Sequence, residues 1–328
     1  MLALGVESTA DNLGIGIVTG EGRVLANVLD IHVPAEGGIH PREAARHHSE
    51  CMGAAVRRAL DEAGVTAREI DIVAFAQGPG LGPCLRTGAT CARAMASYLG
   101  VPLVGVNHCV AHIEIGRVAT GAQDPLTLYV SGGNTLVSGY ESGRYRIFGE
   151  TLDIAVGNCL DTFARAAGLE YPGGPDIERR AAQGKKLIPL PYTVKGMDLS
   201  YSGLLTAVTE ELETGRHSIE DLCFSLQETA YAMLGEITER ALAHTGKPEL
   251  LLTGGVAANR RLGGIVKSIA EEHGAKPYVV PLRLAADNGA MIAWTGILAY
   301  NSGITTPVES SHVNPNWRMD QVEVPWRS

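Results

Sequence analysis

Hydrophobic positions along the first third of the chain repeat with two different periods. Residues 2–18, LALGVESTADNLGIGIV, have apolar runs on both sides of a polar turn, which predicts two strands. In residues 42–64, REAARHHSECMGAAVRRALDEAG, small apolar residues recur at helical spacing and Gly64 ends the pattern, so we expect a helix. Residues 71–88, DIVAFAQGPGLGPCLRTG, predict a strand, a glycine-rich loop and the start of a second helix.

A similar order begins again after residue 125. Residues 126–140, LTLYVSGGNTLVSGY, predict a strand, a glycine turn and a strand. Residues 225–246 predict a long helix that ends at Gly246, and residues 249–264, ELLLTGGVAANRRLGG, predict a strand that leads through a glycine loop into a helix. The repetition predicts an α/β protein of two related domains, with mixed sheets covered by helices and a central cleft in which ligands bind.

The domain boundaries follow from this repetition. We expect an N-terminal domain over residues 1–124 and a second domain over residues 125–300. The remaining segment, residues 301–328, is predicted to be a tail that packs back on the first domain.

Composition narrows the class of protein. The chain has 328 residues, of which 45% are hydrophobic and 19% charged, as in globular proteins. The N-terminus has no pattern of a signal peptide, no apolar run is long enough for a membrane span, and the six cysteines form no CxxC pair, so we expect a cytoplasmic protein with reduced thiols. The net charge of −9 argues against strong binding to nucleic acid by this chain alone.

Two histidines four residues apart are the first candidate for chemistry. In NHCVAHIEIGR, residues 107–117, Asn107 is a good N-cap, so a helix would place His108 and His112 on one face. The motif is not HExxH, because Cys109 follows His108 and the general base of that metalloprotease motif is missing. These residues alone leave two interpretations open, half of a metal site or two polar residues spaced by chance.

Two glycine pairs follow apolar strands, in YVSGGNT at residues 129–135 and in LTGGVAAN at residues 252–259. Glycine lets the backbone approach a ligand and exposes N–H groups to an anion. Each pair taken alone is more often a simple tight turn. We interpret the two pairs as occupying equivalent places in the two halves, which favours a phosphate-binding cleft.

Carboxylates supply further candidates. Asp161 and Glu178 flank YPGG and could accept hydrogen bonds from a ribose, or they could belong to a helix followed by a solvated acidic loop. Asp287 precedes a helix of small residues, where it is either the N-cap or an oxygen ligand that completes the histidine pair. Two histidines and one carboxylate suit a first-row transition metal with open coordination positions.

Taken together, segments in order from residue 5 to about residue 293 resemble the motifs of the TsaD/KEOPS catalytic subunit family, in its archaeal and eukaryotic form. These segments are GVESTAD, GPGLGPCLRTG, NHCVAHIEIGR, YVSGGNT, GETLDIAVGNCLDTFAR, YPGGPDIE, YSGLLTAV, LLTGGVAANRRL and DNGAMIA. The resemblance implies an actin-like, Hsp70-like ATPase fold. It also implies transfer of a threonylcarbamoyl group from threonylcarbamoyl-adenylate to N6 of the adenosine 3′ to the anticodon, in tRNAs that read ANN codons.

The resemblance also assigns roles to residues. It implies one divalent metal, Fe²⁺ before Zn²⁺, with the ligands His108, His112, Tyr129 and Asp287. The implied substrate-binding residues are Tyr129, Val130, Ser131, Gly132, Gly133, Asp161, Gly174, Glu178 and Asn259. No catalytic base is assigned, although Glu7 and Asp11 are candidates for taking up the proton of the amine.

The net negative charge of the chain conflicts with a tRNA substrate, because phosphate contacts normally need Lys and Arg. Two basic segments, at residues 179–186 and 260–261, could be local RNA contacts or solvated helix faces. The resemblance implies KEOPS partners that supply RNA-binding surface, namely a small kinase-like ATPase and a small dimerising subunit. The alanine-rich helix at residues 51–63 could dock a partner, although such a stripe is more often core.

Two other functions are compatible with parts of the sequence. A metallopeptidase would use the HxxxH pair, but the glutamate beside His108 is missing. A metal-dependent ATPase or sugar-kinase-like enzyme on the same fold would turn over ATP with a small acceptor and without tRNA.

Overall fold

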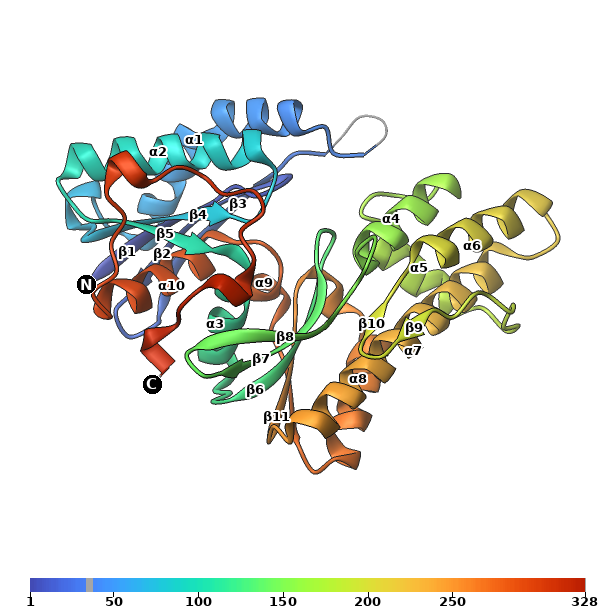
Figure 1. Ribbon diagram of the computed structural model, residues 1–328. Helices are drawn as coiled ribbons and strands as arrows, with labels where there is room; N and C mark the ends of the chain where they lie inside the picture. The colour runs from blue at the N-terminus through green and yellow to red at the C-terminus, as the bar shows by residue number, and fades with distance from the viewer. Residues whose placement is uncertain (34–37, 328) are drawn as a thin grey trace. The chain divides into compact units, whose positions relative to one another are not determined.

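The protein is described by a computed structural model that covers residues 1–33 and 38–327 (Figure 1). The chain divides into two compact units. The first contains residues 1–119, 141–145 and 287–328, and the second contains residues 120–140 and 146–286. This division differs from the predicted domains in three places. Residues 120–124 belong to the second unit, and residues 141–145 and 287–300 belong to the first.

The first unit is built on a five-stranded sheet with the order β3-β2-β1-β4-β5. Strand β1 pairs antiparallel with β2 and parallel with β4, and β4 pairs parallel with β5. Both faces of the central strands are buried, which accounts for their nearly continuous apolar runs. The strands are β1 (Leu2–Glu7), β2 (Asn12–Thr19), β3 (Val24–Ile31), β4 (Ile72–Gly78) and β5 (Leu103–Asn107).

The second unit repeats this arrangement with the order β8-β7-β6-β11-β12. Its first strand, β6, again lies in the middle, with the antiparallel β7 on one side and the parallel β11 on the other. The duplication predicted from the sequence is therefore confirmed. The strands are β6 (Pro125–Val130), β7 (Thr135–Glu141), β8 (Arg144–Glu150), β11 (Glu249–Thr253) and β12 (Lys276–Val279).

Helices cover the sheet of the first unit on both faces, α1 and α2 on one and α10 on the other (Figure 1). The helices are α1 (Pro41–Ala63), α2 (Gly82–Leu99), α3 (His108–Thr120) and α10 (Gly289–Asn301). The predicted end of α1 at Gly64 is confirmed by a left-handed C-cap with φ 67°. The stripe of α1 that contains Met52, Ala55 and Ala59 is buried, so it belongs to the core.

Helix α10 lies in direct backbone contact with the sheet of the first unit. A Cβ added to Gly16 of β2 would lie 2.2 Å from the backbone nitrogen of Ala290, and one added to Gly289 would lie 2.1 Å from that of Gly16. Only glycine permits so close an approach. This contact explains why α10 belongs to the first unit, and it places the start of α10 against the inner strands β1 and β2.

The helices of the second unit are α4 (Val156–Ala166), α5 (Gly173–Ala181), α6 (Ser202–Thr214), α7 (Ile219–Thr245), α8 (Arg260–Glu272) and the short α9 (Leu282–Ala285). Helix α7 ends as predicted at Gly246, which is left-handed with φ 61°. The unit also contains the short strands β9 (Val194–Lys195) and β10 (Asp198–Leu199).

Short turns of 3-10 helix occur in both units. They are η1 (Ala67–Glu69), η2 (Gly255–Ala258), η3 (Val308–Ser310), η4 (Met319–Gln321) and η5 (Pro325–Arg327).

The C-terminal segment lies along the first unit. The N–H of Thr306 donates to Leu103 O at 2.8 Å, and Trp326 Nε1 donates to the buried Glu114 at 3.1 Å. Glu114 also accepts a hydrogen bond from Tyr145 OH at 2.7 Å. No helix in the described residues is long and apolar enough to cross a membrane.

Candidate active site

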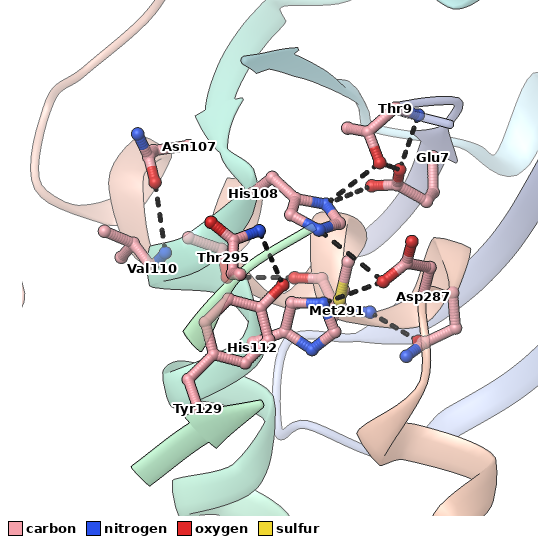
Figure 2. Close-up of polar contacts among 12 residues, drawn as sticks. Glu7, Thr9, Asn107, His108, Val110, His112, Tyr129, Asp287, Met291 and Thr295 are labelled. Carbon is pink, nitrogen blue, oxygen red and sulfur yellow. Dashed lines mark hydrogen bonds and ion pairs between the residues drawn. The ribbon is translucent and has the colours of Figure 1, made fainter. Parts of the chain in front are cut away.

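Helix α3 begins directly at the end of β5, and the side chain of Asn107 holds that junction. Asn107 Oδ1 accepts a hydrogen bond from the N–H of Val110 at 3.1 Å, as expected for the predicted N-cap. His108 and His112 then lie one turn apart on the same face, and both are buried. Their ring centroids are 4.7 Å apart, with the planes nearly perpendicular (Figure 2).

Both imidazoles face Asp287. Asp287 Oδ1 lies 3.0 Å from His112 Nε2 and 3.5 Å from His108 Nε2 (Figure 2). The interpretation of Asp287 as the N-cap of α10 is wrong, because Asn288 Oδ1 accepts the hydrogen bond from Met291 N–H at 2.9 Å. With Asn288 in that role, the carboxylate of Asp287 points to the histidines.

Glu7, at the end of β1, fixes the orientation of His108. Its Oε2 lies 3.0 Å from His108 Nδ1, and its Oε1 accepts hydrogen bonds from the backbone N–H and the hydroxyl of Thr9 (Figure 2). Glu7 is fully buried. An Nδ1–H donated to a carboxylate leaves the Nε2 lone pair free to bind a metal. The sequence offered Glu7 only as a candidate proton acceptor, whereas both of its oxygens are already engaged.

Strand order could have revealed this contact. Strands β1 and β5 run parallel to the same neighbour, β4, so their carboxyl ends meet at one edge of the sheet. Glu7 ends β1 and His108 follows β5, which brings residues about a hundred positions apart into hydrogen-bonding distance.

Asp287, His108 and His112 influence one another's charge. Burial alone would raise the pKa of Asp287, but His108 and His112 outweigh it and lower that pKa to about 2. Burial opposes the charged form of His108, yet Glu7 and Asp287 raise its pKa to about 9, whereas burial lowers the pKa of His112. Before metal binds, the aspartate is therefore ionised, one imidazole is charged and the other is neutral.

The donor set fits a metal ion. One ligand atom from each of His108, His112 and Asp287 lies within 4.8 Å of the others. Two imidazole nitrogens and one carboxylate oxygen suit first-row transition metals. The residues that the sequence singled out are therefore brought together, and their geometry can accommodate a divalent cation.

Tyr129 lies in the second unit, at the end of β6, and is fully buried. Its hydroxyl accepts a hydrogen bond from Asn134 Nδ2 at 3.4 Å, across the glycine turn that follows. Its role as a further metal ligand stays a prediction.

The first glycine turn is held by its own serine. Ser131 Oγ accepts hydrogen bonds from Asn134 N–H at 3.0 Å and, more weakly, from Gly133 N–H at 3.3 Å. Gly132 and Gly133 are exposed, and a Cβ at either would meet no atom within 4 Å. The Val130 side chain is buried, so this residue offers only its backbone to a ligand. The turn is a fixed backbone surface with space beside it.

The second glycine turn lies next to the first. Strands β6 and β11 are parallel neighbours in which Tyr129 pairs with Thr253, and a Cβ on Gly254 would lie 2.1 Å from Val130 O. The interpretation of the two turns as equivalent places in two halves is therefore wrong. Both belong to the second unit, where the carboxyl ends of adjacent parallel strands form one edge of a single sheet.

The predicted ribose-binding residues hold the ends of helices. Asp161 Oδ1 accepts Gly173 N–H at the start of α5 at 2.8 Å, and Glu178 Oε1 accepts Arg260 N–H at the start of α8 at 2.9 Å. Asn259 is the N-cap of α8, and its Nδ2 donates to Gln227 at 3.1 Å. The alternative of a solvated acidic loop is wrong, because residues 173–181 form α5.

Space remains at the start of α5. A Cβ on Gly174 would meet no atom within 4 Å. A ligand can therefore approach the N-terminus of α5 closely.

The two basic segments carry counterions within the chain. Arg179 and Arg180 both contact Asp176, and Arg180 also contacts Glu220 at 3.4 Å. Arg261 binds Glu228 through Nε and an NH2 group, at 2.8 and 2.7 Å. These arginines are partly neutralised, which weakens them as phosphate contacts.

The fold defines the broad class of the protein. Solved structures with actin-like, Hsp70-like ATPase folds are similar to this chain, whose two units repeat one strand order. HypF of T. kodakarensis matches with a TM-score of 0.62 and 16% identity, over 92% of this chain and 48% of that one. The activator of 2-hydroxyisocaproyl-CoA dehydratase from Clostridium difficile matches with a TM-score of 0.56 and 12% identity, over 92% and 97%.

Sequence comparison identifies the family. The family model of TsaD, tRNA N6-adenosine threonylcarbamoyltransferase, matches residues 23–294, and the chain belongs to this family of transferases. A tRNA N6-adenosine threonylcarbamoyltransferase of Thermofilum pendens is 55% identical over 99% of this chain and 97% of its own length. One of Thermococcus kodakarensis is 56% identical over 99% and 100%.

Some relatives are longer. A probable bifunctional tRNA threonylcarbamoyladenosine biosynthesis protein of Methanocaldococcus jannaschii is 55% identical, and the match covers 99% of this chain but 60% of that protein.

Proposed function

We propose that this chain transfers the threonylcarbamoyl group of threonylcarbamoyl-adenylate to N6 of the adenosine 3′ to the anticodon of tRNA. The observation that supports this most strongly is the convergence of His108 Nε2, His112 Nε2 and Asp287 Oδ1 in a member of the TsaD family. We assign the metal site to these residues together with Tyr129, and expect Fe²⁺ before Zn²⁺.

The reaction is an acyl transfer between two nucleophiles. N6 attacks the carbonyl carbon of the mixed anhydride, a C–N bond forms, the bond from that carbon to the phosphate oxygen breaks, AMP leaves and N6 loses a proton. A bound divalent metal supplies Lewis-acid stabilisation of negative charge at the anhydride. His108, His112 and Asp287 hold it, and Glu7 keeps the His108 ring in the required orientation.

The second unit is proposed to hold the adenylate. Gly132 and Gly133 have open space beside them, and the N–H of Gly132 is proposed to stabilise charge on the phosphate and the carbonyl oxygen. The N–H of Ser131 donates to Asn134 O at 2.8 Å and that of Gly133 to Ser131 Oγ at 3.3 Å, so these two groups hold the turn. Asp161 and Glu178 are proposed to contact the ribose hydroxyls, beside the open Gly174. Asn259 acts by holding the start of α8 next to the second glycine turn.

Of the two candidate carboxylates, Glu7 and Asp11, we propose that Asp11 takes up the proton of N6. Glu7 is excluded from this role, because its oxygens are bonded to His108 and Thr9. The same observation weakens the metallopeptidase alternative. A peptidase needs a general base beside the metal, and the carboxylate nearest to His108 apart from Asp287 serves to orient that histidine.

Partners are proposed to supply much of the tRNA contact. The net charge of −9 and the internal ion pairs of Arg179, Arg180 and Arg261 leave Lys185, Lys186 and Arg260 as the exposed cations of the two predicted RNA-binding segments. We therefore expect activity to increase when a small kinase-like ATPase and a small dimerising subunit of a KEOPS complex are present.

Transfer can be tested with chemically prepared adenylate. The chain is incubated with threonylcarbamoyl-adenylate and an ANN-reading tRNA transcript, with and without candidate partners, and nucleosides are analysed by mass spectrometry. We expect threonylcarbamoyladenosine together with stoichiometric AMP. ATP turnover with a small acceptor and no modified nucleoside would favour the sugar-kinase-like alternative instead.

A further inference from the structure

A second cluster of metal-ligand residues lies in the first unit, apart from every residue assigned above. Asp30 comes from the edge strand β3, whereas His47 and Cys51 lie one turn apart on α1. One ligand atom from each lies within 4.8 Å of the other two. Residues four apart on a helix share a face, so the imidazole and the thiol point toward the same strand residue.

Asp30 is the centre of this cluster. Its Oδ1 lies 3.1 Å from His47 Nε2, and its Oδ2 lies 3.5 Å from Arg58 NH1. Burial and Asp30 together raise the pKa of the Cys51 thiol. One carboxylate oxygen is thus paired with a permanent cation, and the other faces an imidazole and a thiol.

His48 helps to position the His47 ring. His48 Nε2 donates a hydrogen bond to Ala10 O at 2.9 Å, and its Nδ1 lies 3.5 Å from His47 Nδ1. The two rings lie edge to face with their centroids 5.7 Å apart. His47 Nε2 is held 3.1 Å from Asp30 Oδ1, where both atoms can reach a shared cation.

His32 lies beside this cluster, outside the group of three whose ligand atoms are within 4.8 Å of one another. Its ring centroid lies 5.5 Å from that of His47, and its Nε2 is buried with no hydrogen-bond partner among the described residues. A buried imidazole nitrogen without a partner is costly in a structural role, and a metal would satisfy it.

We propose that Asp30, His47 and Cys51 form a second site that binds a borderline divalent cation such as Zn²⁺. Nitrogen, sulfur and oxygen are the donor atoms by which proteins bind zinc. The site would join β3 to α1. It would also hold the loop after Glu7, because His48 bonds Ala10 O and His32 N–H donates to Asp11 O at 2.9 Å.

The rival interpretation is an ion-pair network. In that case a doubly protonated His47 and Arg58 both neutralise Asp30, and Cys51 is only a half-buried thiol. The two interpretations differ in whether Cys51 binds a metal.

Cobalt spectroscopy of the full-length chain separates them. Co²⁺ bound by a thiolate gives a charge-transfer band, whereas the proposed ligands of the first site contain no sulfur. Metal-free protein is titrated with Co²⁺ as wild type, C51S and the H108A/H112A double variant. The matched control is C91S, since Cys91 is also half-buried and burial alone raises its pKa.

We expect the band in wild type, C91S and H108A/H112A, and its loss in C51S with unchanged circular dichroism. H48Q should keep the band but weaken Co²⁺ binding by about 10- to 100-fold, because it removes the residue that orients His47. Absence of the band from wild type under saturating Co²⁺, or its persistence in C51S, would overturn the proposal. Loss in H108A/H112A alone would do so as well, by assigning the thiolate to the first site.

Discussion

The two units present functional groups in opposite ways. In the first unit the proposed metal site consists of buried side chains. Glu7 fixes the ring of His108, and Asn288 caps the helix that follows Asp287. In the second unit the proposed phosphate site consists of exposed backbone, where Gly132 and Gly133 have open space beside them. A metal site needs fixed directions, whereas a phosphate site needs N–H groups that a ligand can approach.

The largest effect on the rate of transfer is expected from substitutions of the proposed metal ligands. H112A or D287A should remove bound metal and lower the rate of transfer by about 10³-fold or more, since a Lewis acid contributes several kcal/mol to a transition state. Metal content is measured by atomic emission and transfer by nucleoside mass spectrometry. H273A, which changes a half-exposed histidine bonded to Glu239, should leave both unchanged. Full activity in a verified metal-free H112A protein would contradict the assignment.

Adding one methyl group should affect the two units differently. G289A forces a Cβ against the backbone of Gly16 and should destabilise the fold by about 3 kcal/mol or more, at the upper end of overpacking costs. G133A should change the free energy of unfolding by less than about 0.5 kcal/mol, as is usual for exposed positions. Its effect should appear as a raised KM for the adenylate. Denaturant titrations and steady-state kinetics measure the two effects, and equal destabilisation would contradict the described packing.

Glu7 allows a test of orientation rather than ligation. E7Q removes the charge that holds the Nδ1–H of His108 but leaves every proposed metal ligand in place, so metal affinity should fall by about 10- to 100-fold. Competition with a fluorescent chelator measures the affinity. The matched control is E271Q, an exposed glutamate paired with Lys267 on α8. Equal affinities in wild type and E7Q would show that Glu7 is not a positioning residue.

The smallest effect expected is a pH dependence of metal binding. His108 must lose its proton to bind a metal, and its pKa is raised to about 9 by Glu7 and Asp287 against the opposing effect of burial. Apparent affinity should therefore rise with pH by up to about tenfold per unit and level off above this pKa. E7Q should move that plateau to lower pH. Chelator competition between neutral and alkaline pH measures it, and a flat profile would contradict a charged His108 in the metal-free protein.

Local sequence patterns predicted most elements of the fold. Gly64 and Gly246 marked the ends of α1 and α7, because a left-handed C-cap is a local property of the chain. The duplication was also predicted, since it repeats the order of elements. The pairing of β6 with β11 was not, because about 120 residues separate them and strand order depends on tertiary packing.

The candidate site was also predicted only in part, because local features were predicted and contacts between distant segments were not. The helical spacing of His108 and His112 and the cap at Asn107 are local, and the structure has both. Asp287 and Asn288 are both good caps, and only the structure shows that Asn288 takes that role. The contact of Glu7 with His108 depends on two strands separated in sequence and adjacent to the same neighbour.

The central claim is that the histidine–aspartate group and the glycine turns serve one acyl transfer to tRNA. The most direct measurement supplies threonylcarbamoyl-adenylate to the metal-loaded chain with its partners, and compares an ANN-reading tRNA with the same tRNA carrying guanosine 3′ to the anticodon. We predict threonylcarbamoyladenosine in the first tRNA only, and none from the D287A chain. Modification at equal rates by wild-type and D287A proteins would contradict the claim.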